Sequence, residues 1–132
     1  MKILLDTHIL LWTIADDKKL PQRVKELIFD ADNKVYYSIA SIWEIEIKHS
    51  LGKMPISGQA LSEYCKESGF EMIPIKEAHI FNLNTLKRED DAPKHSDPFD
   101  RIMVSQAKTE SIKFITHDTL IPFYNEECIV SV

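Results

Sequence analysis

The segment from Lys2 to His8 constrains this chain most strongly, because a short apolar run ends abruptly on the carboxylate of Asp6. Residues 3–5 are typical of a strand that is buried on both faces of a parallel sheet. Asp6 is therefore expected at the carboxyl end of a strand. In open α/β sheets, ligands bind at that edge, most often where the order of the strands reverses. The sequence thus predicts a site at this edge, with Asp6 as one member.

Helical and strand-like stretches alternate along the rest of the chain. Further strands are expected at residues 35–37, 70–73, 113–116 and 128–132. Helices are expected over residues 7–15, 21–31, 38–51, 57–68, 75–86 and from 97 onward. Strands separated by helices imply right-handed βαβ units. We therefore expect a three-layer α/β/α sandwich with a central parallel sheet of about five strands.

Composition limits the function classes that remain open. The 132 residues, 44% of them apolar, fit a single domain over residues 1–132. The net charge of −5 argues against a protein that holds nucleic acid through overall charge alone. Cys65 and Cys128 lack CxxC or paired-histidine spacing, which suggests neither a disulfide framework nor a zinc site, and both are expected to be buried thiols. Without a leader peptide or a bilayer-spanning apolar stretch, a cytoplasmic protein with no membrane attachment is expected.

Three further acids have settings that suit a site with Asp6. Asp118 follows a predicted strand, and neighbouring parallel strands would place both carboxylates at the same edge of the sheet. Glu44 lies about one turn into a predicted helix. Asp100 lies in the first turn of the last predicted helix, which Asp97 begins as its N-cap. Asp97 is assigned mainly to the cap, whereas Asp100 is assigned to the site.

Each acid also has a purely structural interpretation, which for Asp100 is an acid near the positive end of a helix that Asp97 caps. An Asp before a helix is an ordinary N-cap worth about 1 kcal/mol, which would account for Asp6. Asp118 fits a turn-forming residue. Glu44 fits a surface ion pair with Lys48, four residues further on. The occurrence of Asp at the ends of two strands favours a shared site over these separate roles.

Four segments together resemble the PIN domain family, and specifically its stand-alone toxins of the VapC type. They are residues 4–8, 41–45, 97–107 and 116–118. The similarity extends in order and spacing over essentially the whole chain, and its most specific part is the Asp-Pro-Phe-Asp-Arg sequence with a downstream Gln-Ala. An Ile-Met-Val-Ser sequence replaces the more usual Leu and Ala residues after Arg101, a core variation that leaves the acids intact. The resemblance implies a single PIN-like nuclease domain with a PIN-like fold.

In that family, four acidic positions bind Mg²⁺ or Mn²⁺ for endoribonuclease chemistry. The resemblance maps these catalytic and metal-binding positions onto Asp6, Glu44, Asp100 and Asp118, and supporting positions onto Thr7, Asp97 and Thr116. It further implies hydrolysis of RNA phosphodiester bonds to a 5′-phosphate and a 3′-hydroxyl. It also implies a toxin role in a type II toxin–antitoxin pair, a cognate antitoxin protein as partner, and a homodimer.

The donor set agrees with this resemblance on chemical grounds. Carboxylates alone, without a Cys or a required His, select a hard cation such as Mg²⁺ or Mn²⁺ over Zn²⁺. Such an ion acidifies a bound water and screens the charge that develops on a phosphoryl oxygen.

Other polar and aromatic residues give less specific signals. His8 and His117 adjoin proposed ligands, and a structural or solvent-facing role is expected for both. Cations that would either meet RNA phosphates or only aid solubility are Lys48, Lys94, His95 and Arg101. Trp12 and Trp43 lie in apolar stretches, so core packing is expected for them rather than base stacking.

Two other functions account for part of the pattern. A phosphoacceptor signalling domain is also a small doubly wound fold, but it needs adjacent acids after its first strand and an Asp after its third. Here Asp6 stands alone, and the strand before Pro74 carries no Asp. A PIN-fold scaffold that binds RNA or protein without cutting is the other alternative, but clustered like charges destabilise a fold that has no metal. A metal-dependent endoribonuclease is the prediction that uses all four acids.

Overall fold

Five short strands form a parallel sheet in the order β3-β2-β1-β4-β5 in the computed structural model, which describes residues 1–132. The strands are β1 (Lys2–Leu5), β2 (Lys34–Ser38), β3 (Glu71–Ile73), β4 (Lys113–Thr116) and β5 (Ile129–Ser131). The helices are α1 (Thr7–Ala15), α2 (Gln22–Phe29), α3 (Ile39–Ser50), α4 (Gly58–Glu67), α5 (Glu77–Phe81) and α6 (Pro98–Glu110). Two 3₁₀ helices, η1 (Asn82–Thr85) and η2 (Ile121–Tyr124), complete the chain.

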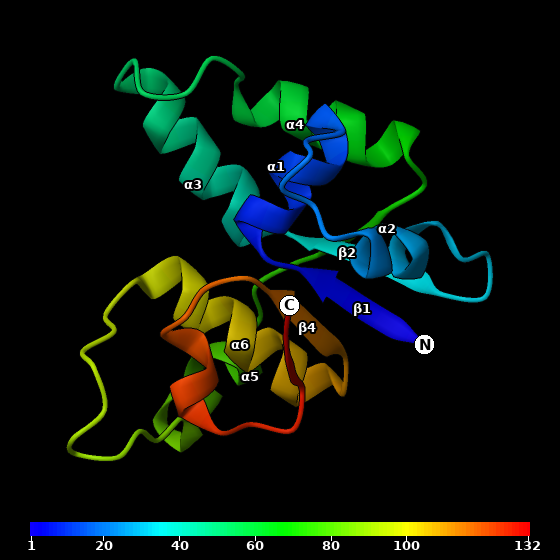
Figure 1. Cartoon of the computed structure of the whole chain (residues 1–132). Helices are drawn as coiled ribbons and strands as arrows, with labels where there is room; N and C mark the ends of the chain where they lie inside the picture. Colours follow the sequence, from blue (N-terminus) through cyan, green and yellow to red (C-terminus); the bar gives the residue numbers. More distant parts are fainter.

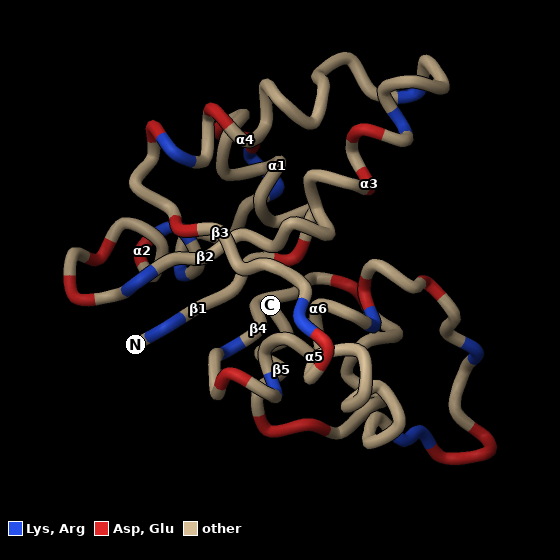
Figure 2. Tube along the Cα trace, turned by 180° about the vertical axis from the view of Figure 1, so that it is seen from behind, with Lys and Arg blue, Asp and Glu red and all other residues tan.

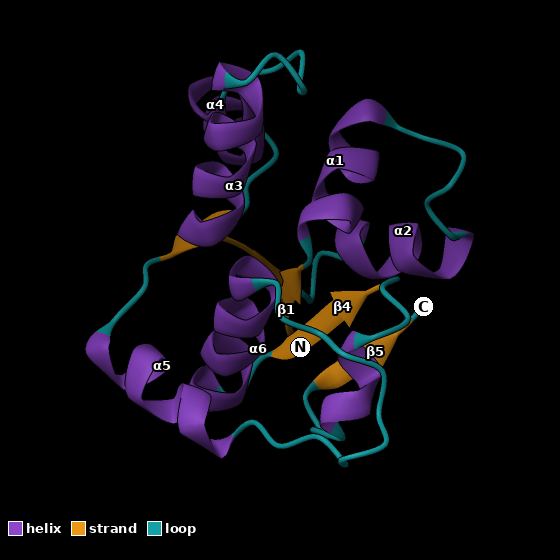
Figure 3. Cartoon of the chain, turned by 90° about the vertical axis from the view of Figure 1, so that its left-hand side faces the viewer, coloured by secondary structure: helices purple, strands orange, loops and turns teal.

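Helices cover both faces of the sheet. Figures 1 and 3 show α1 to α4 on one side and α5 and α6 on the other. Side chains alternate along β1, so that Ile3 and Leu5 enter the core shared with α1, α2 and α4, while Leu4 enters the core shared with α6. Burial on both faces explains why this strand is apolar at every position rather than at every second one. The predicted three-layer α/β/α sandwich is confirmed.

The order of the strands reverses between β1 and β4. From β1 the chain continues to β2 and β3 toward one edge of the sheet, whereas β4 and β5 extend toward the other edge. Leu5 pairs in register with Ile115, and the backbone N–H of Asp6 donates to the carbonyl of Ile115 at 3.0 Å. The chain just beyond β1 is therefore still tied to β4. This reversal is the position where open α/β sheets bind ligands.

Side-chain caps fix the start of the helices that leave this edge. Ser38 accepts a hydrogen bond from the backbone N–H of Ala40 at 3.0 Å and caps α3; in the sequence, Ser38 and Ser41 were both candidates for this cap. Asp97 caps α6 by accepting from the N–H groups of Phe99 and Asp100 at 2.9 and 3.1 Å. Because α3 directly follows β2 and α6 leads into β4, the first turns of both helices lie at the carboxyl ends of the strands.

Close packing joins α3 to α4 at Gly58. A Cβ atom on this residue would lie 2.8 Å from the carbonyl oxygen of Ile42. Glycine is therefore required for the two helices to approach each other this closely.

Some sequence predictions were wrong in detail. The second helix ends at Phe29, so Ala31 lies outside it and is exposed. Residues 75–86 form the short α5 and η1 rather than one helix, and η2 was not predicted. Trp43 is 58% exposed instead of packed in the core, and its ring meets that of Phe99 in α6 edge-on, with centroids 5.0 Å apart.

Other predictions hold wholly or in part. Trp12 is half-buried and packs against the core on the α1 side of the sheet. Cys65 is buried, whereas Cys128 is only half-buried, and both thiols are free. None of the helices is both long enough and apolar enough to cross a membrane.

Candidate active site

The four predicted acids lie at the carboxyl ends of the strands, around the reversal of strand order. Asp6 follows β1 directly, and Asp118 lies two residues after β4, the neighbouring strand. Glu44 lies in the first half of α3, and Asp100 in the first turn of α6. Figure 1 shows β1 and β4 near the middle of the molecule, with α3 and α6 to their left. The prediction that Asp6 and Asp118 share an edge of the sheet is confirmed.

Asp6 is a buried carboxylate with both oxygens engaged. Its Oδ1 accepts the backbone N–H of His8 at 2.9 Å, which makes it the N-cap of α1, and its Oδ2 accepts the hydroxyl of Thr116. Burial raises the pKa of Asp6 above its usual value, although the bonds from Thr116 and His8 oppose this shift. The N-cap interpretation and a site role are therefore compatible, since each oxygen has a second lone pair.

Asp118 also has a structural role that uses one of its oxygens. Its Oδ1 accepts the N–H groups of Leu120 and Ile121 at 2.7 and 3.2 Å and so holds the start of η2. The backbone N–H of Asp118 in turn donates to the hydroxyl of Thr116 at 3.0 Å. Its Oδ2 accepts no hydrogen bond from the protein.

Glu44 forms the ion pair that the sequence suggested, but not on an open surface. Its Oε2 lies 3.1 Å from the ammonium of Lys48, while only 9% of the Glu44 side chain is exposed. Its Oε1 is buried and has no hydrogen-bond partner. A buried carboxylate oxygen without a partner is costly, so its presence calls for a ligand that the protein itself does not supply.

Asp100 has a strongly raised pKa. Burial, followed by the charges of Asp97, Asp6, Asp118 and Glu44, raises the pKa of Asp100 to about 8. Its Oδ2 lies 3.2 Å from Nε2 of His95, whereas its Oδ1 accepts no hydrogen bond. The other three acids therefore all contribute to the raised pKa of Asp100.

Three of these acids share a pattern that fits a cation. Glu44, Asp100 and Asp118 each use one oxygen to hold the side chain in place and leave the other without a protein partner. The atoms left free to bind a metal are all carboxylate oxygens, which suit Mg²⁺ or Mn²⁺. In the observed arrangement, however, no group of three or more His, Cys, Asp or Glu side chains is close enough together to hold a metal ion. The residues therefore fit a hard cation by donor type alone.

The expected supporting residues form polar contacts beneath the acids. The hydroxyls of Thr7 and Ser41 lie 2.8 Å apart and join the start of α1 to α3. Thr116 contacts both strand-end acids, and Asp97 caps α6. All of these contacts hold the helix and strand ends in place without occupying the free oxygens.

Sequence reasoning missed one pair of residues at the site. His95, considered only as an RNA contact, lies with Nδ1 2.6 Å from the hydroxyl of Tyr124 and with Nε2 against Asp100. Burial lowers the pKa of His95. In the sequence, only the short spacing between His95 and Asp100 indicated a role for His95 at the site, and nothing indicated one for Tyr124.

The two histidines next to proposed ligands lie elsewhere. Both His8 and His117 are exposed. Nδ1 of His117 contacts the carbonyl of Val132 at 2.6 Å, and its ring packs edge-on against Trp12. The structural or solvent-facing interpretation of His117 is thus confirmed.

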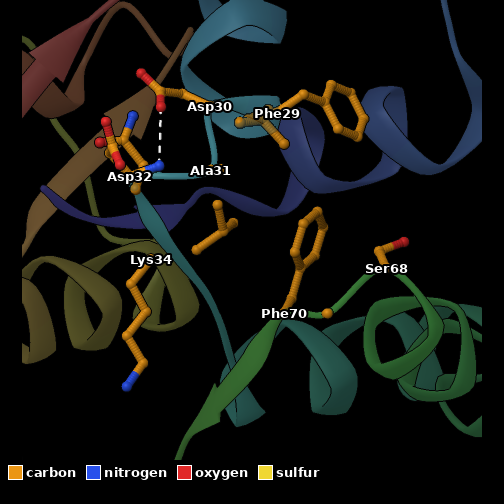
Figure 4. Close-up of a pocket in the computed structure, with 11 residues that line it drawn as sticks. Phe29, Asp30, Ala31, Asp32, Lys34, Ser68 and Phe70 are labelled. Atoms are coloured by element: carbon orange, nitrogen blue, oxygen red, sulfur yellow. Dashed lines mark hydrogen bonds between the residues drawn. The ribbon is translucent and has the colours of Figure 1, made fainter.

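A separate pocket lies at the opposite edge of the sheet, where the strands begin. Figure 4 shows Phe29 and Phe70 on its walls, with Asp30, Asp32 and Lys34 nearby and a hydrogen bond from the Asp32 N–H to Asp30. None of the four predicted acids lines it. Lys and Arg residues are scattered along the whole trace (Figure 2) rather than gathered on one side. The acidic cluster is therefore distinct from both this pocket and any basic surface.

Comparison with known proteins places the chain in a family. Among solved structures of similar fold are VapBC2 from Rickettsia felis bound to a promoter DNA fragment (17% identity, TM-score 0.67, 100% of this chain and 98% of that chain covered) and FitAcB from Neisseria gonorrhoeae (19%, 0.65, 98% and 96%). A toxin–antitoxin complex from Klebsiella pneumoniae is also similar (17%, 0.64, 98% and 96%). No curated protein matched the sequence. The PIN domain model matches residues 3–124, and the chain therefore belongs to the PIN domain family.

Proposed function

We propose that this protein is a metal-dependent endoribonuclease that hydrolyses RNA phosphodiester bonds as the toxin of a toxin–antitoxin pair. The observation that carries the proposal is the set of buried and half-buried carboxylates at the reversal of strand order, where the pKa of Asp100 rises to about 8. Strongly perturbed acids at a ligand-binding edge are typical of catalytic sites. Membership in the PIN family supports the same assignment.

The chain's own residues would provide the ligands and their orientation. Asp6, Glu44, Asp100 and Asp118 would hold one or two Mg²⁺ or Mn²⁺ ions. When bound, such an ion supplies an acidified water and charge screening at the scissile phosphate. Without a cation, burial and then the neighbouring negative charges favour the protonated form of Asp100. The hydrogen bonds from Thr116 and His95 would keep the acids oriented as they deprotonate.

RNA cleavage in defined metal conditions tests this proposal. Purified protein should cut single-stranded or looped RNA with Mg²⁺ or Mn²⁺, and excess EDTA should abolish the activity. Asp100→Asn and Asp118→Asn should each lower the rate severely, because each removes a charged ligand. Full activity in EDTA, or in either variant, would refute the metal mechanism.

A catalytically inactive PIN-fold module remains a second candidate, because no three acids converge as they stand and Glu44 is paired with Lys48. Such a module would bind RNA or protein equally well with and without Mn²⁺ and would leave RNA intact. The same cleavage assay, run beside a binding assay, separates the two functions.

The toxin role predicts a protein partner. Of the structures of similar fold, one is of VapBC2 and another is of a toxin–antitoxin complex, and we propose a cognate antitoxin here, together with a homodimer of this chain. An antitoxin segment that covers the acids would inhibit cleavage, and an inserted Arg could pair with the carboxylates in place of the metal. Growth arrest on expression alone, relieved by co-expression of an adjacent small reading frame, is the expected result. Expression without any effect on growth would contradict the toxin role but not the nuclease assignment.

A further inference from the structure

We propose that His95 and Tyr124 are positioning residues that hold the Asp100 carboxylate ready for a metal ion. The hydroxyl of Tyr124 lies 2.6 Å from Nδ1 of His95, and Nε2 of His95 lies 3.2 Å from Oδ2 of Asp100. These contacts form one continuous chain from the C-terminal part of the protein to the first turn of α6. The inference rests on the proposed function, because it takes Asp100 as a metal ligand.

The direction of the hydrogen bonds follows from the role of the carboxylate. An ionised carboxylate only accepts hydrogen bonds, so a metal-binding Asp100 needs the proton of the neutral His95 ring on Nε2. Nδ1 is then an acceptor, and the hydroxyl of Tyr124 donates to it. Tyr124 thereby selects the ring tautomer that supports Asp100. Oδ1 of Asp100 accepts no hydrogen bond and stays available to a cation.

Packing holds the rings of His95 and Tyr124 in place. The His95 and Tyr124 rings meet edge-on, with centroids 5.4 Å apart and planes at 81°, and only 4% of the His95 side chain is exposed. The guanidinium carbon of Arg88 lies 5.0 Å from the ring centroid of Tyr124 and 5.6 Å from that of Phe123. Both terminal nitrogens of Arg88 are buried without a hydrogen-bond partner, so the aromatic faces are what this cation contacts.

The segment that carries Tyr124 is itself anchored at the site. Asp118 holds the first N–H groups of η2 through its Oδ1, and Tyr124 is the last residue of η2. One acid of the cluster therefore fixes the start of this short helix, and the end of the helix reaches a second acid through His95. The two acids are held relative to each other by one structural unit.

Removal of single groups tests this role. Tyr124→Phe deletes only the hydroxyl and keeps the ring against Arg88. His95→Gln keeps an N–H donor for Asp100, whereas His95→Ala keeps none. Tyr37→Phe is the matched control, because Tyr37 is a buried tyrosine of β2 whose hydroxyl forms no hydrogen bond within the chain.

Two readouts are needed besides cleavage. Calorimetric titration with Mn²⁺ measures metal affinity, and the ¹⁵N chemical shifts of the His95 ring in the Mg²⁺-bound protein report which nitrogen is protonated. Loss of a residue that orients a metal ligand through hydrogen bonds weakens metal affinity by about 10- to 100-fold. The Mn²⁺ affinities of Tyr124→Phe and His95→Ala should both be reduced by factors in that range. His95→Gln should stay within about threefold of the wild type, since its donor remains. Tyr37→Phe should match the wild type.

The outcomes separate this inference from the proposed function. Wild-type protein that binds no Mn²⁺ overturns both. Mn²⁺ binding by the wild type with equal affinity in Tyr124→Phe, or a wild-type His95 ring protonated on Nδ1, overturns the positioning role alone. If Tyr124→Phe does not fold, as judged by circular dichroism, equal Mn²⁺ affinities of His95→Gln and His95→Ala overturn it instead.

Discussion

Asp6 and Thr116 are joined by a hydrogen bond across the neighbouring strands β1 and β4, although 110 residues separate them in the chain. The hydroxyl of Thr116 donates to Oδ2 of Asp6, and its oxygen accepts the backbone N–H of Asp118 at 3.0 Å. A single hydroxyl thus connects the two acids that end the central strands.

Thr116→Val should destabilise the protein, because it leaves Oδ2 of the buried Asp6 carboxylate without a donor and the Asp118 N–H without an acceptor. The expected loss in the free energy of unfolding is about 1 to 3 kcal/mol. Thr116→Ser retains the hydroxyl and should lose less. Urea unfolding of both variants in EDTA makes the comparison, and equal losses would contradict the role given to the hydroxyl.

The stability of the metal-free protein should fall as the pH rises from about 4 to about 8. The pKa of Asp100 is about 8 in the folded protein, above the value of an unfolded Asp, so the folded state binds more protons between the two values. The stabilisation from this proton is complete below the unfolded pKa and is lost as the pH passes through the folded pKa. The slope reaches at most about 1.4 kcal/mol per pH unit for this one group.

Urea unfolding in EDTA at several pH values measures this slope. Asp100→Asn should flatten it, because the titrating group is gone. A wild-type stability that instead increases over this pH range would show that the cluster is ionised when the protein folds.

Asp97 is expected both to cap α6 and to raise the pKa of Asp100 through its charge. Asp97→Asn keeps a capping oxygen and should cost a few tenths of a kcal/mol, whereas Asp97→Ala should cost about 1 kcal/mol. Both substitutions remove the charge that, after burial, contributes most to the raised pKa of Asp100. The pH dependence of stability should therefore shift to lower pH in both variants, while only Asp97→Ala loses the cap. Severe loss of RNA cleavage in Asp97→Asn would instead make Asp97 a ligand.

The fold was predictable because its signals are local. Apolar strands end on polar residues, and Ser38 and Asp97 cap helices at their expected positions. Where such signals were weak, the prediction was wrong. The 75–86 segment has helical spacing but breaks after Phe81, and Trp43 lies in an apolar helical stretch but is 58% exposed. Periodicity identifies an apolar face but does not reveal whether anything packs on it.

Trp43→Ala should accordingly cost little stability. The side chain is largely exposed and has one aromatic contact, to Phe99 at 5.0 Å between centroids. The expected loss is no more than about 1.5 kcal/mol. Trp12→Ala should cost more, because Trp12 is half-buried and packs against the core. Thermal or urea unfolding of the two variants side by side checks the order, and a larger loss for Trp43→Ala would contradict it.

The candidate site was predictable only in its acids. Asp6 and Asp118 could be paired because consecutive strand ends share an edge in a parallel sheet. The contact of His95 with Tyr124 joins the loop before α6 to the short 3₁₀ helix η2, and no periodic pattern or capping rule connects these two segments. The burial of Glu44, which turns an ordinary helix ion pair into a charge with one unpartnered oxygen, also depends on tertiary packing.

The central claim is that the four carboxylates form one metal site, and a thermal melt with and without Mn²⁺ tests it most directly. At ten times its dissociation constant, the metal should add about 1.4 kcal/mol and raise the midpoint of the wild type by about 3 to 6 °C. Asp6→Asn should melt higher than the wild type in EDTA, because a buried charge is replaced by an amide, and should show a smaller Mn²⁺ shift. An Mn²⁺ shift in Asp6→Asn equal to that of the wild type would reduce Asp6 to a helix cap and contradict the site built around it.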